Sequence, residues 1–177
     1  MQIMDVAAFQ RLYGPWLELA KPLLLEGRWK EAFKEYPLVH NDDVPWAPLA
    51  KPLSESTLGL FTTAGLYSDG EQERFDAPNI EGDWSTRLLP ADVNPKRLRI
   101  AHDHFDHTVA EADRNSVFPV DRLRDRVTEG ILGGFHGGTV SMSGYNPRAD
   151  RVAEKTAPAV VRVFQDAGVD AVLFVPV

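Results

Sequence analysis

Residues 102–107, with the sequence His-Asp-His-Phe-Asp-His, bring three imidazoles and two carboxylates into one short stretch. In an extended or loop backbone, side chains two residues apart point the same way, so His102, His104 and Asp106 are expected to converge. Imidazole and carboxylate groups together suit a divalent metal such as zinc, iron, nickel or manganese. A more distant ligand is available in His136, which lies in a glycine-rich loop. The pattern predicts a metal held by His102, His104 and His136; a solvated histidine loop is the alternative.

The same region supplies candidates for acid and base catalysis. An imidazole has a reference pKa of about 6.5 and exchanges protons at neutral pH, while a bound metal activates water or polarises a carbonyl. His107 and Asp113 are therefore the candidate acid/base groups. Asp106 is either a fourth metal ligand or the hydrogen-bond partner of a ligating imidazole. Redox, elimination and hydrolytic reactions all remain open.

Polar side chains at nearby strand ends and turns are candidates for binding a small-molecule substrate. Thr62 and Thr63 offer hydroxyls where an expected strand ends, although a strand-ending turn requires no function. Arg87 could pair with a substrate carboxylate through two hydrogen bonds, or hold Asp83 in place. Asn115 could bind a substrate amine or carboxyl group, or only cap its own loop.

The composition limits the classes of partner and cofactor. The formal net charge is -7 and the cationic residues are scattered among acids, so nucleic acid is not an expected partner. The absence of cysteine removes disulfides, thiolate nucleophiles and sulfur-ligated metals. The sequence has no nucleotide-cofactor signature and no apolar run of about 20 residues that would span a membrane, so we expect a cytoplasmic protein without a membrane partner.

The elements that must position these residues alternate along the chain. Apolar, β-branched runs at 57–63, 98–101 and 171–175 predict strands, and helical patterns at 119–130 and 150–168 lie between the last two. Strands alternating with helices predict an α/β fold with a three-layer, largely parallel sheet and helices on both faces. Ligands of such sheets gather at the carboxyl ends of the strands, where the candidate residues fall.

Three segments make up one globular unit. Residues 1–36 have apolar side chains at helical intervals and predict two or three short helices, with interruptions at Gly14-Pro15, Pro22 and Gly27. Residues 37–56 are rich in proline and predict an extended connector or lid. Residues 57–177 form the expected α/β domain.

Several sequence blocks occur in the order found in a known family. They resemble the motifs of component B of glycine/sarcosine/betaine reductase and of the similar D-proline reductase subunit, from about Trp46 to the end of the chain. The block at 113–123, Asp-x-Asn-x-Val-Phe-Pro-x-Asp-Arg-Leu, is quite specific. The remaining blocks are Lys51–Ser56, Thr62–Gly65, Gly82–Arg87, His102 with Phe105-Asp106, Glu129–Ile131, His136, Gly144 and Gly168–Leu173.

The resemblance implies a reductase subunit, but one element of the family is missing. In that family the strand corresponding to 172–175 is followed by a selenocysteine or cysteine, which attacks the substrate carbon that bears nitrogen. This sequence stops at Val177, where that motif would begin. A genuine short form is our preferred expectation; a reading truncated at a selenocysteine codon is the alternative. In the short form, the exposed strand edge predicts a homo-oligomer or a companion subunit.

Together these observations predict a small-molecule enzyme similar to the reductase component B, in which a His/Asp site, with or without a metal, replaces the missing selenol or thiol. The alternative is a noncatalytic subunit or binding module of a larger reductase-like complex.

Overall fold

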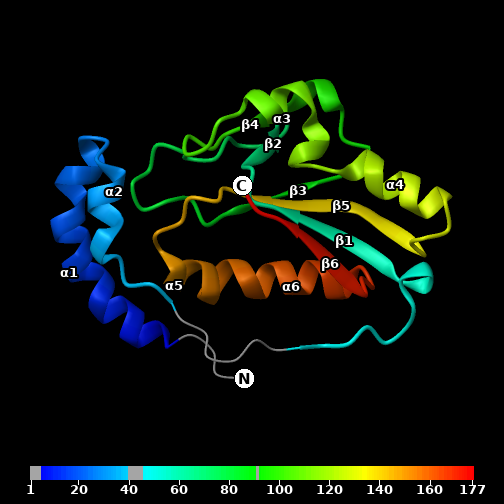
Figure 1. Ribbon diagram of the computed structural model, residues 1–177, viewed down its shortest axis with the longest axis horizontal. Helices are drawn as coiled ribbons and strands as arrows, with labels where there is room; N and C mark the ends of the chain where they lie inside the picture. Colours follow the sequence, from blue (N-terminus) through cyan, green and yellow to red (C-terminus); the bar gives the residue numbers. More distant parts are fainter. Residues whose placement is uncertain (1–4, 40–45, 91) are drawn as a thin grey trace.

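The computed structural model describes residues 5–39, 46–90 and 92–177. Its centre is a four-stranded sheet with the strand order β3-β5-β1-β6 (Figure 1). The strands are β1 (Thr57–Thr62), β3 (Thr86–Leu89), β5 (Gly134–Met142) and β6 (Ala171–Val175). β5, β1 and β6 are parallel and β3 is antiparallel, so the prediction of a largely parallel sheet is confirmed.

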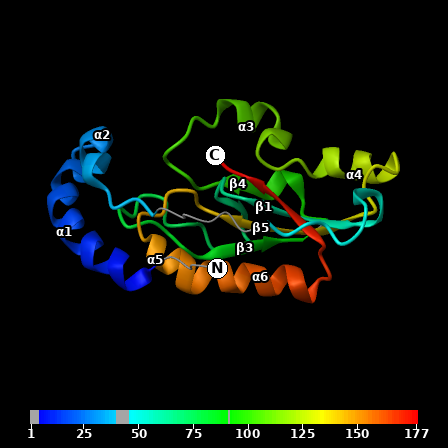
Figure 2. The same ribbon diagram turned by 60° about the horizontal axis from the view of Figure 1, so that its bottom comes forward.

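Helices cover both faces of this sheet, as predicted (Figure 2). On one side lie α3 (Thr108–Ala112) and α4 (Val120–Thr128), and on the other lies α6 (Ala157–Asp166). Residues 98–101 were expected to form a strand beside β1 and β6. The strand exists, but β4 (Leu98–Ile100) pairs with β2 (Leu66–Ser68) in a separate two-stranded sheet.

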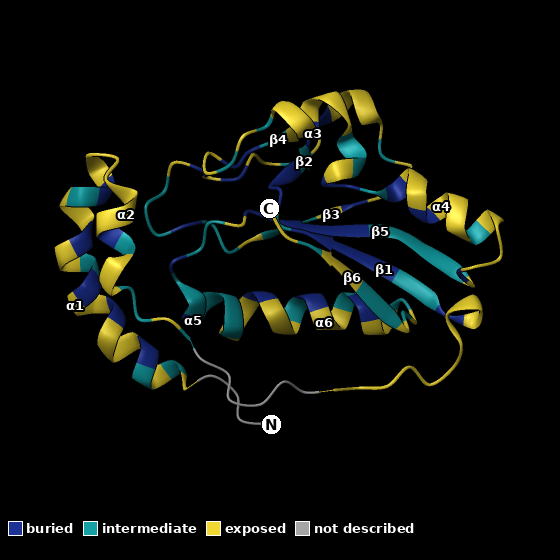
Figure 3. Ribbon diagram, viewed as in Figure 1, coloured by how far each residue is buried: buried dark blue, intermediate teal, exposed yellow. Residues whose placement is uncertain are grey.

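Side chains that alternate between the two faces of β1 divide the core into two halves. Leu60 faces a cluster of buried side chains from α3, α4, β2 and β4, while Phe61 faces Val160 and Phe164 of α6. Because neighbouring strand residues point to opposite faces, one apolar strand serves both layers. Burial is therefore highest in the second halves of β1 and β5 and lower in β6 and on the outer faces of the helices (Figure 3).

The remaining helical elements of the described residues are short. The π-helix at Val152–Thr156 joins α5 to α6, and four 3-10 turns punctuate the loops. The bounds of these elements are α5 (Ala149–Arg151), η1 (Phe33–Glu35), η2 (Leu53–Glu55), η3 (Pro95–Arg97) and η4 (Arg114–Ser116). The predicted connector at 37–56 falls partly on residues 40–45, which lie outside the described residues.

The expected glycine-rich loop around His136 is instead the first half of strand β5. Gly134 and Phe135 pair with Thr57 and Leu58 of β1, and the register then shifts between Leu58 and Leu60. Strand pairing uses backbone groups, so glycine-rich sequence does not prevent it, and the shift accommodates the extra residues as a bulge.

The N-terminal segment contains one long helix, α1 (Val6–Leu25), followed by α2 (Trp29–Ala32). The predicted interruptions at Gly14-Pro15 and Pro22 are wrong, since both prolines lie inside α1. Although an interior proline removes a backbone hydrogen bond, a buried stripe on one face of the helix compensates. That stripe comprises Phe9, Tyr13, Trp16, Ala20 and Leu24. Among the described residues, no helix has the length and apolarity needed to cross a membrane.

This helical segment is attached to the body through the loop after β5. The Tyr36 hydroxyl donates to the Pro147 carbonyl over 2.8 Å, and the Gln10 amide donates to the Asp150 carboxylate over 3.2 Å. Arg148 binds the buried Asp150 with two hydrogen bonds of 2.9 and 2.7 Å, which lower the pKa of Asp150 to about 2. As Figure 1 shows, α1 and α2 therefore face the end of the sheet where the parallel strands finish.

Candidate ligand-binding site at the carboxyl edge of the sheet

Four chain segments meet where the parallel strands end. Thr63 follows β1, Gly144 follows β5 and Val177 follows β6, while His102 enters from the loop after β4. The Val177 amide donates to the Thr63 hydroxyl over 3.0 Å. A Cβ added to Gly144 would lie 2.7 Å from His102 Nε2 and 3.2 Å from the backbone oxygens of Thr63 and Val177. Glycine at position 144 therefore lets the four segments close on one another.

His102 is the buried titratable group at this junction. His102 is 3% exposed, and its Nδ1 atom accepts a 3.2 Å hydrogen bond from the His104 amide. Burial, followed by the nearby His104 and His107, lowers the pKa of His102 to about 4. The ring is therefore neutral at pH 7, and because Nδ1 acts as an acceptor, the hydrogen-bond network assigns the proton to Nε2.

The Nε2–H group of His102 has no hydrogen-bond partner among the described residues. A buried donor left without an acceptor costs about 1 to 3 kcal/mol. Six buried side-chain atoms of the described residues lack a hydrogen-bond partner, and His102 Nε2 is the one that belongs to a titratable ring at the carboxyl edge of the sheet. His102 thus offers a neutral, oriented donor for an oxygen atom at the carboxyl edge of the sheet.

His107 and Asp106 support the loop that carries His102. His107 Nε2 lies 2.7 Å from the His102 carbonyl oxygen and donates to it. Asp106 accepts hydrogen bonds from the Thr108 amide (2.9 Å) and hydroxyl (2.6 Å), which lower the pKa of its carboxyl group. The Asp106 contacts are those of a residue capping the start of α3.

His136 lies far from the other histidines. It falls in β5 at the level of Leu58–Leu60 of β1, whereas His102 adjoins Gly144 beyond the other end of the strand. His136 and Gly144 are eight residues apart along the chain and lie near opposite ends of β5. Within the described ranges, no group of three or more His, Cys, Asp or Glu side chains is placed to hold a metal ion. The predicted convergence of His102, His104 and His136 is not found.

Asp113, Asn115 and Thr62 make local structural contacts. Asp113 accepts the backbone and side-chain N–H groups of Asn115 at 2.9 and 3.1 Å, which lower the pKa of its carboxyl group. These hydrogen bonds cap η4. Thr62 is fully buried and donates to the Val117 carbonyl over 2.8 Å, which ties β1 to the segment before α4. In the structure, Asp113 and Asn115 stabilise the turn before α4, and Thr62 joins β1 to Val117.

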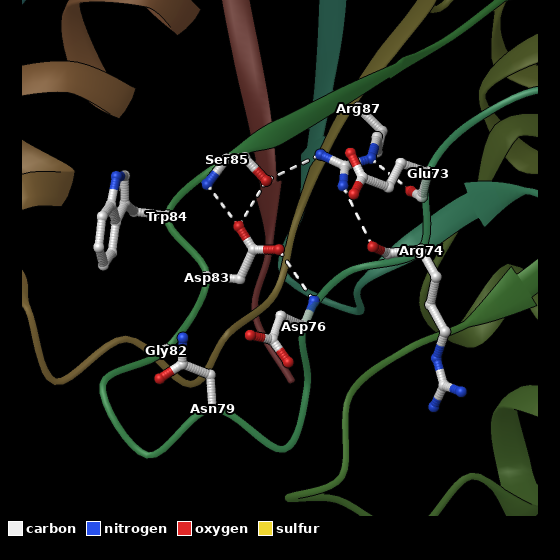
Figure 4. A pocket seen from close by; sticks show the side chains of 9 residues that line it. All are labelled: Glu73, Arg74, Asp76, Asn79, Gly82, Asp83, Trp84, Ser85 and Arg87. Atoms are coloured by element: carbon white, nitrogen blue, oxygen red, sulfur yellow. Dashed lines mark hydrogen bonds between the residues drawn. The ribbon is translucent and has the colours of Figure 1, made fainter.

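Arg87 has most of its donors engaged by its own loop. Its guanidinium donates to the Glu73 carbonyl (2.7 Å), the Ser85 hydroxyl (2.8 Å) and the Thr86 carbonyl (3.1 Å), and it lies 4.2 Å above the Phe75 ring. Figure 4 shows the hydrogen bonds of Arg87 with Glu73 and Ser85 in the lining of a pocket of about 410 Å³. Arg87 therefore holds the 73–87 loop together instead of offering a free two-donor face to a substrate carboxylate.

Asp83 fixes the opposite wall of that pocket. It accepts the backbone amides of Asp76 and Ser85 at 3.0 and 2.9 Å, and these bonds, together with that of the Ser85 hydroxyl, lower the pKa of its carboxyl group despite burial. Gly82 adopts a φ of +83°, and a side chain there would lie 2.5 Å from the Tyr145 carbonyl. The loop thus packs directly against the segment that follows β5.

Sequence reasoning missed an aromatic hollow beside the His102 junction. Its volume is about 530 Å³, and its lining includes Trp29 and Phe33 from the N-terminal segment, Phe105 from the loop after β4 and Tyr145 from the loop after β5. The His104 ring stacks on Tyr145 with centroids 3.9 Å apart. The aromatic residues are distant in the sequence and share no periodicity, so only the proximity of Tyr145 to the family-like Gly144 could have indicated them.

Comparison with known proteins places the whole arrangement in context. The family model described as glycine/sarcosine/betaine reductase selenoprotein B matches residues 21–176, and therefore begins earlier than the motif blocks suggested. The chain is 30% identical over 128 residues to D-proline reductase subunit gamma of Acetoanaerobium sticklandii, covering 72% of this chain and 51% of that protein.

Other relatives belong to similar complexes. The betaine reductase complex component B subunit beta of Peptoclostridium acidaminophilum is 31% identical over 172 residues, covering 89% of this chain and 38% of the relative. The glycine reductase complex component B subunit gamma of Carboxydothermus hydrogenoformans is 30% identical over 141 residues, covering 78% of this chain and 32% of the relative. The chain thus spans about half the length of the D-proline reductase subunit and about a third of the other two. No solved structure gives a significant match.

Proposed function

This chain belongs to the glycine/sarcosine/betaine reductase selenoprotein B family, and from that premise we propose that it is the substrate-binding subunit of a reductase-type complex. The relatives are named for reductases of D-proline, glycine and betaine. All three compounds carry a carboxylate one carbon away from a nitrogen. The proposed substrate class is a small amino acid or N-methylated amino acid of that kind.

The unpaired Nε2–H of His102 is the observation that carries this proposal. A carboxylate oxygen placed at this donor completes its hydrogen bonding, and a bond to a charged acceptor is stronger than one between neutral groups. The ring is already neutral at pH 7 because burial lowers its pKa to about 4, so binding requires no change of protonation. His102 would therefore position the substrate by its carboxylate.

Access to this donor requires the backbone around it to move. In the structure Nε2 is buried beside Gly144, and the backbone oxygens of Thr63 and Val177 lie close to the same glycine. Gly144 has no side chain to withdraw, and Val177 is joined to the junction by one amide hydrogen bond to Thr63. Displacement of this backbone would open His102 to the space above the strand ends.

These 177 residues contain no cysteine, so reductive chemistry through sulfur would need a group that lies outside them. The edge strand β6 supports association with another chain. In the described sheet it pairs only with β1, and its Leu173 and Phe174 are 38% and 62% exposed. An unpaired edge with apolar side chains is a typical surface for attachment of another chain. We therefore propose β6 as the surface to which a companion subunit attaches.

Calorimetric titration with glycine, sarcosine, betaine and D-proline tests the binding proposal. At least one compound should bind, and His102→Asn, which keeps an acceptor near the Nδ1 position but has no donor at Nε2, should weaken it by roughly 10- to 100-fold. His102→Gln restores a donor near Nε2 and should recover much of the affinity. His136→Asn, at the opposite end of the sheet, is the matched control.

Absence of binding for all four compounds would refute the proposal. Binding that is unaffected by His102→Asn would place the substrate elsewhere on the chain.

A further inference from the structure

The aromatic hollow is a corner between two walls that come from distant parts of the chain. One wall is the stacked pair of His104, from the loop after β4, and Tyr145, from the loop after β5, whose ring planes differ by 24°. The other wall is Trp29 of α2, whose ring stands at 85° to His104 and 81° to Tyr145. The corner bounds a recess of about 530 Å³. A flat group that lies against one wall therefore presents its edge to the other.

Hydrogen bonds to the backbone hold both walls in place. The Tyr145 hydroxyl donates to the Ile80 carbonyl over 2.9 Å, and burial raises the pKa of this hydroxyl to about 12, so it stays neutral. The Trp16 indole donates over 2.8 Å to the carbonyl of Ala32, the last residue of the helix that carries Trp29. A preorganised recess loses little conformational entropy when it accepts a partner group.

The charge of the hollow favours a cationic group. Asp103 is exposed and lines the hollow, and the chain as a whole carries a formal net charge of -7. Burial lowers the pKa of His104, so this ring adds no positive charge at pH 7. Aromatic faces attract a cation through the ring quadrupole, and the carboxylate attracts it directly.

The rings that line the hollow are only partly covered by the chain itself. Trp29 is 38% exposed, and the remaining aromatic rings of the lining are half-buried, namely Phe33, Phe105 and Tyr145. Aromatic residues are enriched in protein–protein interfaces, and tryptophan and tyrosine are enriched among those that contribute most of the binding energy. The composition of the hollow is therefore that of a docking surface.

The hollow is continuous with the strand edge proposed for a companion subunit. Tyr145 directly follows Gly144 in the chain. A Cβ added to Gly144 would lie 3.2 Å from the backbone oxygen of Val177, which is two residues beyond the end of β6. A chain attached along β6 that continues past the carboxyl end of this strand therefore comes next to Tyr145.

Building on that proposed attachment, we propose that the hollow receives an arginine side chain of the companion subunit. A guanidinium group is flat, stacks on aromatic faces and offers two parallel N–H donors to a carboxylate such as that of Asp103. A lysine ammonium is a compact, strongly hydrated charge and fits the corner less well.

The test uses capped glycine-X-glycine tripeptides in which X is arginine, lysine or citrulline. Citrulline has the shape of arginine without its charge. Each peptide is titrated against the full chain labelled with nitrogen-15, and the NMR shifts of the Asp103 and Tyr145 amides report binding. The arginine peptide should bind with a Kd in the millimolar range, roughly tenfold more tightly than the citrulline peptide, with the lysine peptide between them.

Variants of both walls and of the carboxylate locate the binding. Trp29→Leu and Asp103→Asn should each weaken the arginine peptide by roughly three- to tenfold, whereas Trp29→Phe keeps a ring and should retain most of the affinity. Trp46→Leu and Asp166→Asn are the matched controls, because both residues are exposed and neither lines the hollow. Circular dichroism of each variant establishes that it is folded.

Equal affinity for the arginine and citrulline peptides, or no binding of the arginine peptide, overturns the proposal. Tighter binding of free L-arginine than of its capped peptide also overturns it, because the hollow would then recognise a small molecule by its own ammonium or carboxylate.

The attachment at β6 is tested separately by Phe174→Asp and light scattering. Assembly that depends on Phe174, without a preference for arginine, refutes the hollow alone. A preference for arginine that Trp29→Leu removes, without assembly through β6, supports the hollow and refutes attachment at that strand.

Discussion

The acid sensitivity of folding should be dominated over part of its range by one side chain, His102. In the unfolded chain this imidazole takes up a proton below its ordinary pKa of about 6.5. In the folded protein, burial and the neighbouring His104 and His107 keep it neutral down to about pH 4. Between these two pH values the unfolded state binds more protons than the folded state. The free energy of unfolding therefore falls as the pH is lowered through this window.

The size of the effect follows from the two pKa values. Their difference corresponds to about 3 kcal/mol when the pH has fallen below both, and about 2 kcal/mol of this is lost by pH 5. The measurement is urea-induced unfolding at closely spaced pH values from 7 to 4.5. Burial also lowers the pKa of His104, so that ring acts in the same direction within the same window. Carboxylates such as Asp83 and Asp150, whose pKa values are also lowered, act in the same direction but mostly at lower pH.

Comparison with variants isolates the contribution of His102. His102→Asn and His102→Gln cannot titrate, so each should lose about 2 kcal/mol less than the wild type between pH 7 and pH 5. A variant that is less stable than the wild type at pH 7 still gives a valid result. The quantity compared is the change in the free energy of unfolding between pH 7 and pH 5, not its value at one pH. Parallel pH profiles for the wild type and both variants would show that His102 is not buried in its neutral form, and would remove the basis of the proposed donor.

Two further changes test the junction and the sheet edge. Gly144→Ala places a methyl group 2.7 Å from His102 Nε2 and should lower the free energy of unfolding by about 1 to 3 kcal/mol and weaken ligand binding. Gly14→Ala, on an exposed helical position, should change stability little in the same denaturation assay, because the gain in helix propensity is offset by the clash of the new Cβ with Pro15. Phe174→Asp should disrupt a complex with a companion chain or a second copy, so the mass measured by light scattering should fall. Leu19→Asp, at a position on α1 that is 74% exposed, is the control and should leave that mass unchanged. An unchanged assembly in Phe174→Asp would exclude the β6 edge as the attachment surface.

The N-terminal helical segment contributes to the candidate site. The motif blocks begin near Trp46, yet Trp29 and Phe33 line the hollow at the carboxyl edge of the sheet. The Gln10–Asp150 and Tyr36–Pro147 hydrogen bonds attach this segment to the residues that follow Tyr145. The family match, which starts at residue 21, is consistent with α2 being part of the conserved unit.

The sequence by itself determined the fold class and the family. Apolar runs and helical periodicity located β1, β6, α4 and α6, because burial on both faces of a sheet and on one face of a helix leaves a local pattern. The absence of cysteine excluded thiolate chemistry without any coordinates. Strand β5 was missed because its first half is rich in glycine and owes its conformation to pairing with β1.

Only the tertiary structure decided which polar residues meet. Spacing suggested that His102, His104 and His136 share a metal, but strand β5 carries His136 to the opposite end of the sheet. Arg87, Asp106 and Asp113 make hydrogen bonds within their own loops, and a sequence does not reveal how many of a side chain's donors and acceptors are already satisfied. The unpaired donor of His102 arises from burial and from the tautomer fixed by the His104 amide, which are properties of packing in three dimensions.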